Sequence, residues 1–109
     1  MTYVIATQLK PTDRGAFIAS IGSMIRPKLE AAGADYVVVQ EGISSGSQTG
    51  MFTVGSRWSS VDQGVAGLGA FYADPEVAAF LASTPVDVAF RRTGLVDAVR
   101  GNPNGAFKI

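Results

Sequence analysis

Hydrophobic and β-branched residues gather in four stretches that predict strands. The first covers residues 3–9 and ends at a Lys-Pro pair, and residues 36–43 and 51–58 flank a turn-rich connection. Because this connection is short, the second and third strands are expected to form an antiparallel hairpin. The last strand is expected over residues 86–90, with its extension to residue 99 left open.

Between the first two strands, apolar residues recur at helical spacing. From residue 17 to residue 29 this spacing predicts a helix, which Thr12 or Asp13 can cap at its N-terminus. Gly33 suits the end of this helix. Pro27 has no backbone N–H to donate, so we expect it to kink the helix or to split it in two.

A second helical region follows the third strand. Ser60 and Gln63 fit a capping box, and the apolar residues at 61, 65 and 68 are expected on one side of the helix. Three glycines within residues 64–69 weaken helix formation and predict a loose or broken segment as far as Tyr72. These glycines either permit close packing or form a mobile lid over a pocket. Their GxxGxG order differs from the GxGxxG of dinucleotide-binding sites.

Asp74-Pro75-Glu76 begins a further helix. The aspartate is an N-cap, the proline occupies the first helical position, and the glutamate is an acidic residue in the first turn. The apolar stripe of this helix comes from Val77, Phe80 and Leu81.

The order of elements is therefore βαββαβ, the split pattern of a ferredoxin-like α+β sandwich. It predicts a four-stranded antiparallel sheet with the helices on one face. At 109 residues the chain is expected to form a single domain over residues 1–100, followed by an irregular tail over residues 101–109.

The two faces of the predicted sheet are both apolar near its middle. If the hairpin pairs about the centre of its loop, one face carries Tyr36, Val38, Phe52, Val54 and Trp58. The other then carries Val37, Val39, Met51, Thr53 and Gly55, and ends in Glu41 and Arg57. Only one face can lie under the helices, so the other needs a cover, most simply a second copy of the same sheet. The expected partner is thus the protein itself, in a homodimer formed through the sheet face.

Composition removes several classes of function. The nine basic and nine acidic residues balance, which argues against sequence-independent nucleic-acid binding. The sequence contains neither cysteine nor histidine. Thiolate and imidazole metal ligands, cysteine nucleophiles and histidine bases are therefore excluded, and we expect no metal and no bound cofactor.

No stretch of the sequence has the features of a targeting or membrane-spanning segment. The first five residues lack the charged and apolar regions of a signal peptide, and the apolar runs are only as long as strands. We therefore expect a cytoplasmic protein that is not bound to a membrane.

Two motifs resemble a known superfamily. Phe52 followed by Trp58 and Ser60 resembles a pattern in dimeric α+β barrel proteins, where a strand ends in tryptophan and a Ser-capped helix begins. These proteins include the antibiotic-biosynthesis monooxygenase-like and heme-degrading monooxygenase-like families. Residues 73–81, with Asp-Pro-Glu near their start, resemble a helix start in stress-responsive and NIPSNAP-like barrels and in small uncharacterised relatives.

The resemblance implies a dimer with a pocket between sheet and helices, and it does not imply one reaction. Monooxygenase-like members often carry a histidine about nine residues after the tryptophan, whereas here that distance leads to Gly67. This departure argues against heme degradation with a histidine ligand.

Aromatic residues are the candidates for ligand binding. Trp58 could form the wall of a pocket for a flat aromatic molecule, or could be a core residue paired across the hairpin with Tyr36. Tyr36 and Phe71 are further candidates for ligand binding, or core residues. Tyr72 lies in the glycine-weakened segment, where its hydroxyl could reach a pocket as a hydrogen-bond donor or weak acid.

Charged residues near strand ends are the other candidates. Arg57 and Arg91 could hold a carboxylate or an enolate, and the simpler alternative is a solvated rim or an ion pair. Glu41 lies on an otherwise apolar strand, where partial burial would raise its pKa towards a catalytic range. Its alternative is an exposed charge at the end of a strand. The candidate catalytic set is therefore Tyr72, Glu41 and Arg57.

Two functions from different classes fit these residues. The first is a cofactor-independent monooxygenase-like or isomerase-like enzyme acting on a small aromatic or polyketide-like molecule. The second is a non-catalytic homodimer that binds a small molecule or is purely structural, because every aromatic residue and glycine also has a packing explanation.

Overall fold

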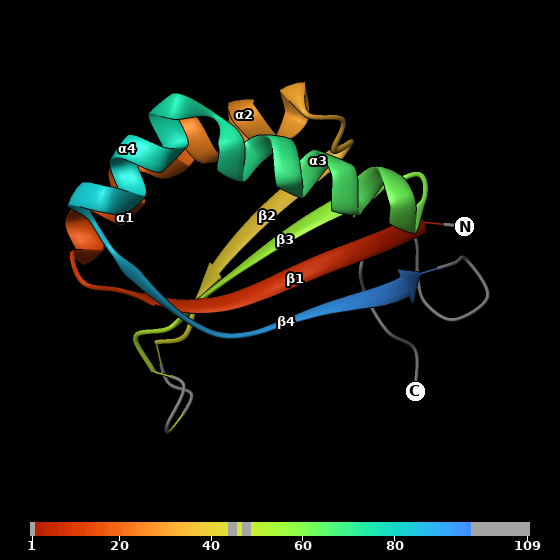
Figure 1. Cartoon of the computed structure of the whole chain (residues 1–109). Helices are drawn as coiled ribbons and strands as arrows, with labels where there is room; N and C mark the ends of the chain where they lie inside the picture. The colour runs from red at the N-terminus through yellow and green to blue at the C-terminus, as the bar shows by residue number, and fades with distance from the viewer. Residues whose placement is uncertain (1, 44–45, 47–48, 97–109) are drawn as a thin grey trace.

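The computed structural model describes residues 2–43, 46 and 49–96, and it has the predicted ferredoxin-like α+β fold. Its single sheet has four strands in the order β2-β3-β1-β4, with every neighbouring pair antiparallel. All the helices lie on one face of this sheet (Figure 1). The strands are β1 (Thr2–Pro11), β2 (Tyr36–Glu41), β3 (Phe52–Trp58) and β4 (Val86–Val96). The expected tail over residues 101–109 lies outside the described residues.

The first helical region is split, as the position of Pro27 predicts. Asp13 caps α1 (Arg14–Ser20) by accepting a hydrogen bond from the backbone N–H of Ala16. A five-residue π-helical segment, η1 (Ile21–Ile25), then leads into α2 (Arg26–Ala31). Pro27 lies in the first turn of α2, directly after the π-helical segment, where its fixed φ suits a helical position. Gly33 follows the helix with a positive φ of 116°.

The register of the hairpin differs by one residue from the expected register. Tyr36 lies opposite Arg57, Val38 opposite Gly55 and Glu41 opposite Phe52. The expected grouping of Tyr36 and Val38 with Phe52, Val54 and Trp58 is therefore wrong. Because side chains alternate along a strand, a shift of one residue moves each side chain of one strand to the opposite face.

The helix-facing side of the sheet carries the core. Val37 and Val39 of β2 share this side with residues of β3 and β1, and the buried core includes Ile5, Leu9, Phe52 and Trp58. The opposite side carries Tyr36 and Val38, which are 54% and 37% exposed, and Phe90, which is 44% exposed. It also carries Arg57 and Arg92, so this face is partly apolar and partly charged. None of the described elements covers it (Figure 1).

The glycine-rich segment forms a continuous helix, α3 (Val61–Ala73), and the expected loose or broken segment is wrong. Ser60 caps it by accepting from the backbone N–H of Gln63, as predicted. The buried side of this helix carries Gly64, Gly67 and Phe71, whereas Val61 and Val65 are exposed. Gly64 and Gly67 face the sheet because only a residue without a side chain fits so close to Trp58.

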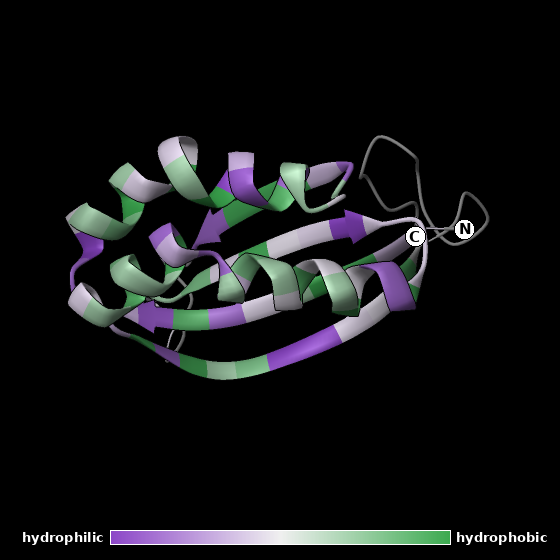
Figure 2. Ribbon diagram, turned by 45° about the horizontal axis from the view of Figure 1, so that its top comes forward, coloured by the Kyte–Doolittle hydropathy of each residue, from purple (hydrophilic) through white to green (hydrophobic). Residues whose placement is uncertain are grey.

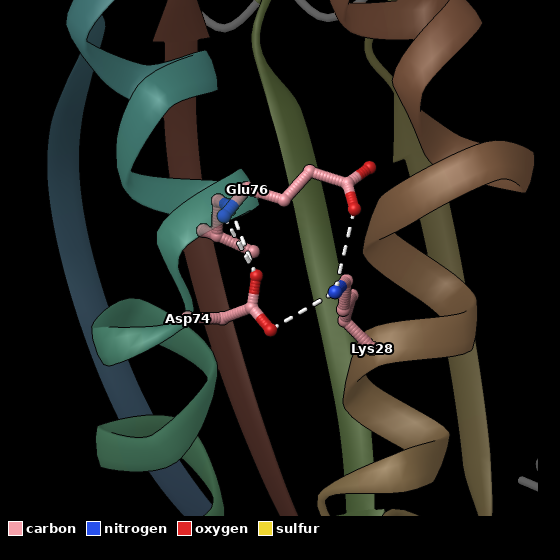
Figure 3. A network of polar contacts seen from close by, with 4 residues as sticks. Lys28, Asp74 and Glu76 are labelled. Atoms are coloured by element: carbon pink, nitrogen blue, oxygen red, sulfur yellow. Dashed lines mark hydrogen bonds and ion pairs between the residues drawn. The ribbon is translucent and has the colours of Figure 1, made fainter.

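The last helix, α4 (Pro75–Ser83), begins where the sequence predicts it. Asp74 accepts hydrogen bonds from the backbone N–H groups of Glu76 and Val77. Lys28 of α2 reaches across to this helix start and binds Asp74 at 2.9 Å and Glu76 at 3.3 Å (Figure 3). The hydrogen bond from Lys28 lowers the pKa of the Asp74 carboxyl below its usual value.

Within the described residues, no single helix is long and apolar enough to cross a membrane. Helices α3 and α4 reach the required length and composition only when they are taken together, and a bend of 65° separates them.

Candidate functional site

A cavity of about 50 Å³ lies between the sheet and the helices. Its walls come from all the helical segments and from strands β1, β3 and β4. Most of the lining is apolar, with Leu68 and Phe71 from α3 and Val77, Phe80 and Leu81 from α4. The predicted apolar stripe of α4 therefore faces this cavity.

The tight contact at Trp58 and the position of the cavity are connected. A Cβ atom at Gly64 would lie 2.7 Å from Ile5 Cδ1 and 3.1 Å from Trp58 Cδ1, and one at Gly67 would overlap the indole ring. Helix α3 therefore rests directly on the sheet along its first two turns. Its last turns carry Leu68 and Phe71, whose larger side chains stand between helix and sheet and leave the cavity beside them.

Three polar residues line the cavity: Thr7, Ser56 and Tyr72. Ser56 is 3% exposed, and its hydroxyl accepts from Trp58 Nε1 at 2.8 Å and donates to the Ile5 carbonyl at 3.4 Å. Because both contacts are internal, Ser56 serves the packing of Trp58. Thr7 and Tyr72 are left as the polar groups that can meet a ligand.

Arg91 joins Thr7 and Tyr72 at the edge of the cavity. The antiparallel register places Arg91 of β4 directly opposite Thr7 of β1. Its Nε donates to Thr7 Oγ1 at 2.9 Å, and its Nη2 donates to the Tyr72 hydroxyl at 2.6 Å. Thr7 is buried at 5% exposure, whereas Tyr72 is 38% exposed, so this group runs from the interior to the surface.

Arg91 has no carboxylate partner among the described residues. The cations Arg14, Lys28 and Arg57 do pair with carboxylates. Arg91 instead donates two of its five N–H groups to neutral hydroxyl oxygens. It is therefore a positive charge with unused donors beside an apolar cavity. Figure 2 shows the hydrophilic stretch of β4 between more hydrophobic ones.

The other charged candidates lie away from the cavity lining. Arg14 holds Glu41 in a two-pronged ion pair, with contacts of 2.6 Å and 2.9 Å. This hydrogen bond lowers the pKa of Glu41, the opposite of the expected rise. Arg57 pairs with Asp35 at 2.8 Å, and its guanidinium carbon lies 5.2 Å from the centre of the Tyr36 ring, on the open face of the sheet.

Two of the aromatic candidates, Trp58 and Tyr36, do not line the cavity. Trp58 is fully buried at 0% exposure and does not line the cavity, and the expected cross-strand pair with Tyr36 is wrong because Tyr36 faces the other side of the sheet. Phe71 does line the cavity, and its ring packs edge-on against Tyr72 with ring centres 5.2 Å apart. Of the seven candidates, the structure therefore brings together Phe71, Tyr72 and Arg91.

Thr7 belongs to this site but is not among the candidates predicted from the sequence. The signal is a polar side chain at the middle helix-facing position of β1, between Ile5 and Leu9. A polar residue at a position predicted to be buried needs a hydrogen-bond partner, and here that partner is Arg91.

No group of three or more histidine, cysteine, aspartate or glutamate side chains in the described part of the chain is placed to hold a metal ion. The site is instead built from a phenol, a threonine hydroxyl and a guanidinium, which are hydrogen-bond donors to an oxygen of a ligand.

No protein-family model and no curated protein sequence matches the chain at a significant level. Solved structures do match it. Protein Atu4242 from Agrobacterium tumefaciens aligns with a TM-score of 0.66 and 12% identity, covering 99% of this chain and 100% of that one. A dimeric ferredoxin-like protein from an uncultured marine organism aligns with a TM-score of 0.66 and 12% identity, covering 88% and 94%.

A third structure is described as that of a candidate antibiotic biosynthesis monooxygenase from Chloroflexus aurantiacus. It aligns with a TM-score of 0.54 and 16% identity, covering 89% of this chain and 94% of that one. The identities are low and the coverage is nearly complete, so the likeness concerns the fold. The chain therefore has the ferredoxin-like α+β fold shared by these proteins.

Proposed function

We propose that this protein binds a small aromatic or polyketide-like molecule in the cavity and holds a ligand oxygen at Tyr72 and Arg91. The observation that carries the proposal is the Thr7–Arg91–Tyr72 group at the edge of an apolar cavity. Ligand sites are commonly apolar pockets with a few converging polar groups, which is the arrangement seen here.

The chemistry that suits this arrangement is stabilisation of an oxyanion. A phenolate or enolate oxygen at the Tyr72 hydroxyl would also meet the positive charge of Arg91, whose Nη2 lies 2.6 Å from that hydroxyl. Donors that are already in place where negative charge develops lower a reaction barrier without reorganisation. The protein therefore acts as a monooxygenase-like or isomerase-like enzyme without a bound cofactor.

Oxygenation takes its electrons from the substrate, and isomerisation needs no net transfer of electrons. In oxygenation, a methylene group next to the enolate loses two hydrogens and becomes a carbonyl, while O₂ supplies one atom to the product and one to water. In isomerisation, one carbon of the substrate gives a proton to water, which forms the enolate, and water returns a proton to a different carbon. The proposal assigns the ligand oxygen to Tyr72 and Arg91 and a place in the apolar wall to Phe71, and it assigns no role to Glu41, Arg57 or Trp58.

A second candidate function is a non-catalytic one, a homodimer that binds a small molecule or is purely structural. The observation in its favour is the size of the cavity, about 50 Å³, compared with about 150 Å³ for an engineered cavity that binds benzene. A ring can enter only if side chains such as Leu68 or Phe80 move outwards, so ligand binding requires a small opening of the helical layer.

We also propose that the protein is a homodimer in which the open sheet faces meet. Its support is the exposed apolar surface of Tyr36, Val38 and Phe90 on a face that no described element covers. One matching structure is described as dimeric, which adds support by analogy.

The two functions are separated with 2-tetralone, an aromatic ketone with an acidic methylene group. Wild-type protein should accelerate exchange of that methylene with deuterated water, followed by NMR, and oxygen uptake then distinguishes oxygenation from isomerisation. Tyr72→Phe and Arg91→Gln should each reduce the acceleration by roughly tenfold to a hundredfold, since each removes one donor to the oxyanion. Arg14→Gln is the matched control, because Arg14 pairs with Glu41 away from the cavity.

Binding of 2-tetralone without faster exchange would favour the non-catalytic function. Equal exchange rates in wild type, Tyr72→Phe and Arg91→Gln would contradict the assigned roles.

A further inference from the structure

Arg91 can act as counter-ion for an anionic ligand at this cavity, but the described lining contains no side chain that could act as the base and form the anion. None of the described residues that line it is an aspartate, glutamate, histidine or lysine. Beside it, Arg91 is a permanent cation with no carboxylate partner among the described residues. The proton of an enol or phenol must therefore leave to water, before or during binding.

We propose that the Thr7–Arg91–Tyr72 group selects acidic enols and phenols and binds them as their anions. This inference rests on the proposed function, because it concerns the same cavity, and it names the substrate class: an apolar molecule whose enol or phenol ionises near neutral pH. Less acidic phenols of the same shape bind less tightly at neutral pH because little of their anion is present.

The hydrogen-bonding inventory of the site favours an anion over a neutral phenol. The Thr7 and Tyr72 oxygens both accept from Arg91, so their own hydrogens are free to be donated. Arg91 retains three further N–H donors. The oxygen of a phenolate can only accept hydrogen bonds, so it matches the free hydroxyl hydrogens of Thr7 and Tyr72 and the remaining N–H donors of Arg91. A neutral phenol would bring another O–H into a site whose oxygens already accept from Arg91.

Thr7 is the positioning residue of this group. Its side chain is buried, and its Oγ1 holds Nε of Arg91 at 2.9 Å, which fixes the guanidinium with Nη2 at the Tyr72 hydroxyl. An arginine whose Nε is held in this way loses less freedom when it binds a ligand. Loss of the Thr7 hydroxyl should therefore weaken binding of the anion while leaving the charge of Arg91 in place.

The binding step breaks only one bond. The O–H bond of the ligand breaks and its proton goes to water. The electron pair stays on the oxygen, to which Tyr72 and Arg91 donate hydrogen bonds. No oxidant, reductant or protein base takes part.

The probe for the test is 4-nitrophenol, whose anion is coloured and which ionises near neutral pH. Its apparent pKa is measured by absorbance with rising concentrations of the protein. An opposite charge in direct contact typically lowers the pKa of an acid by one unit or more, so binding to the wild type should lower it by about one unit. The neutral ether 4-nitroanisole, which has nearly the same shape and no acidic hydrogen, reports on binding to the apolar walls alone.

Variants assign the effect to the group. Arg91→Gln should abolish the pKa shift and leave the affinity for 4-nitroanisole unchanged. Thr7→Val should reduce the shift, whereas Thr7→Ser, which restores the hydroxyl, should recover it. Arg14→Gln should behave as the wild type, and melting curves check that each variant is folded.

The outcomes separate this inference from the proposed function. Binding of both probes with no pKa shift, or a shift that survives Arg91→Gln, would overturn the anion selectivity and leave the cavity as a binding site. Failure of both probes to bind at any pH would overturn the binding site itself and the selectivity with it.

Discussion

Gly67 is the position where the size of a single side chain decides how α3 packs. A Cβ atom there would overlap the ring of Trp58 and lie 3.2 Å from the carbonyl oxygen of Ala32. Trp58 cannot move aside, because it is fully buried and its Nε1 is held by Ser56. The glycine therefore lowers the helix propensity of α3 but allows the helix to pack closely against Trp58.

Gly67→Ala should lower the free energy of unfolding by about 1–3 kcal/mol, the usual cost of overfilling a packed core. Gly69→Ala is its matched control, since Gly69 lies on the same helix with open space around its Cα. That variant should gain up to about 1 kcal/mol from helix propensity. Urea unfolding curves of both variants measure the difference, and equal destabilisation by the two would contradict the packing argument.

At the scale of elements, Asp74 connects three helices. It ends α3, caps α4 and pairs with Lys28 of α2 (Figure 3). The same side chain therefore holds the bend between α3 and α4 and attaches it to the first helical region. Since α3 carries Tyr72 and α4 carries Phe80, this junction also positions two walls of the cavity.

Two substitutions separate the capping role of Asp74 from its ion pair. Asparagine is as good an N-cap as aspartate, so Asp74→Asn should lose only the contact with Lys28. Asp74→Ala should lose both, and should have the lower melting temperature of the two. Thermal unfolding at neutral pH measures the order, and identical melting temperatures would show that the cap contributes nothing.

The ion pair also predicts a dependence on pH. Because Lys28 lowers the pKa of Asp74 in the folded protein, the contribution of this pair is complete above the pKa of aspartate in the unfolded chain. It is lost as the pH falls through the lower pKa of the folded state. The melting temperature of the wild type should therefore approach that of Asp74→Asn on acidification. A constant difference between the two across that range would contradict this linkage.

At the scale of the whole molecule, the open face of the sheet decides assembly. Tyr36, Val38 and Phe90 expose apolar surface on it, beside the charges of Arg57 and Arg92. This face is less apolar than either face of the expected sheet, because the true register places Tyr36 and Val38 beside Gly55 and Arg57.

Val38→Asp should convert the expected dimer into a monomer, because it places a charge in the middle of the proposed interface. Val65→Asp is the control, since Val65 is also an exposed valine but lies on α3, in the helical layer. Light scattering after gel filtration reads the mass of each. A dimeric Val38→Asp protein, or a monomeric wild type, would contradict the sheet-to-sheet interface.

Most of the fold is predictable because its signals are local. The caps at Asp13, Ser60 and Asp74 each act on backbone groups within three residues, so the sequence contains the whole interaction. Pro27 splits its helix for an equally local reason, the missing N–H. The glycines of α3 mislead because helix propensity is local, whereas the contact with Trp58 that offsets it is tertiary.

The candidate site is predictable only in part. Phe71, Tyr72 and Arg91 are recognisable as aromatic and charged candidates, but residue type alone does not separate them from Glu41, Arg57 and Trp58. Tertiary contacts separate them, because Arg14 pairs with Glu41, Arg57 faces the open side of the sheet, and Trp58 is fully buried. Side-chain alternation along a strand is visible in the sequence, and the pairing partner is not.

The sequence by itself determined the order of strands and helices, the ends of most helices and the absence of cysteine and histidine chemistry. Only the tertiary structure decided which side chains meet. Thr7 and Arg91 are 84 residues apart, and they touch because β1 and β4 pair in one register. Tyr72 joins them because α3 rests on Trp58 through its glycines. Such contacts depend on the packing of distant segments, which no local pattern in the chain records.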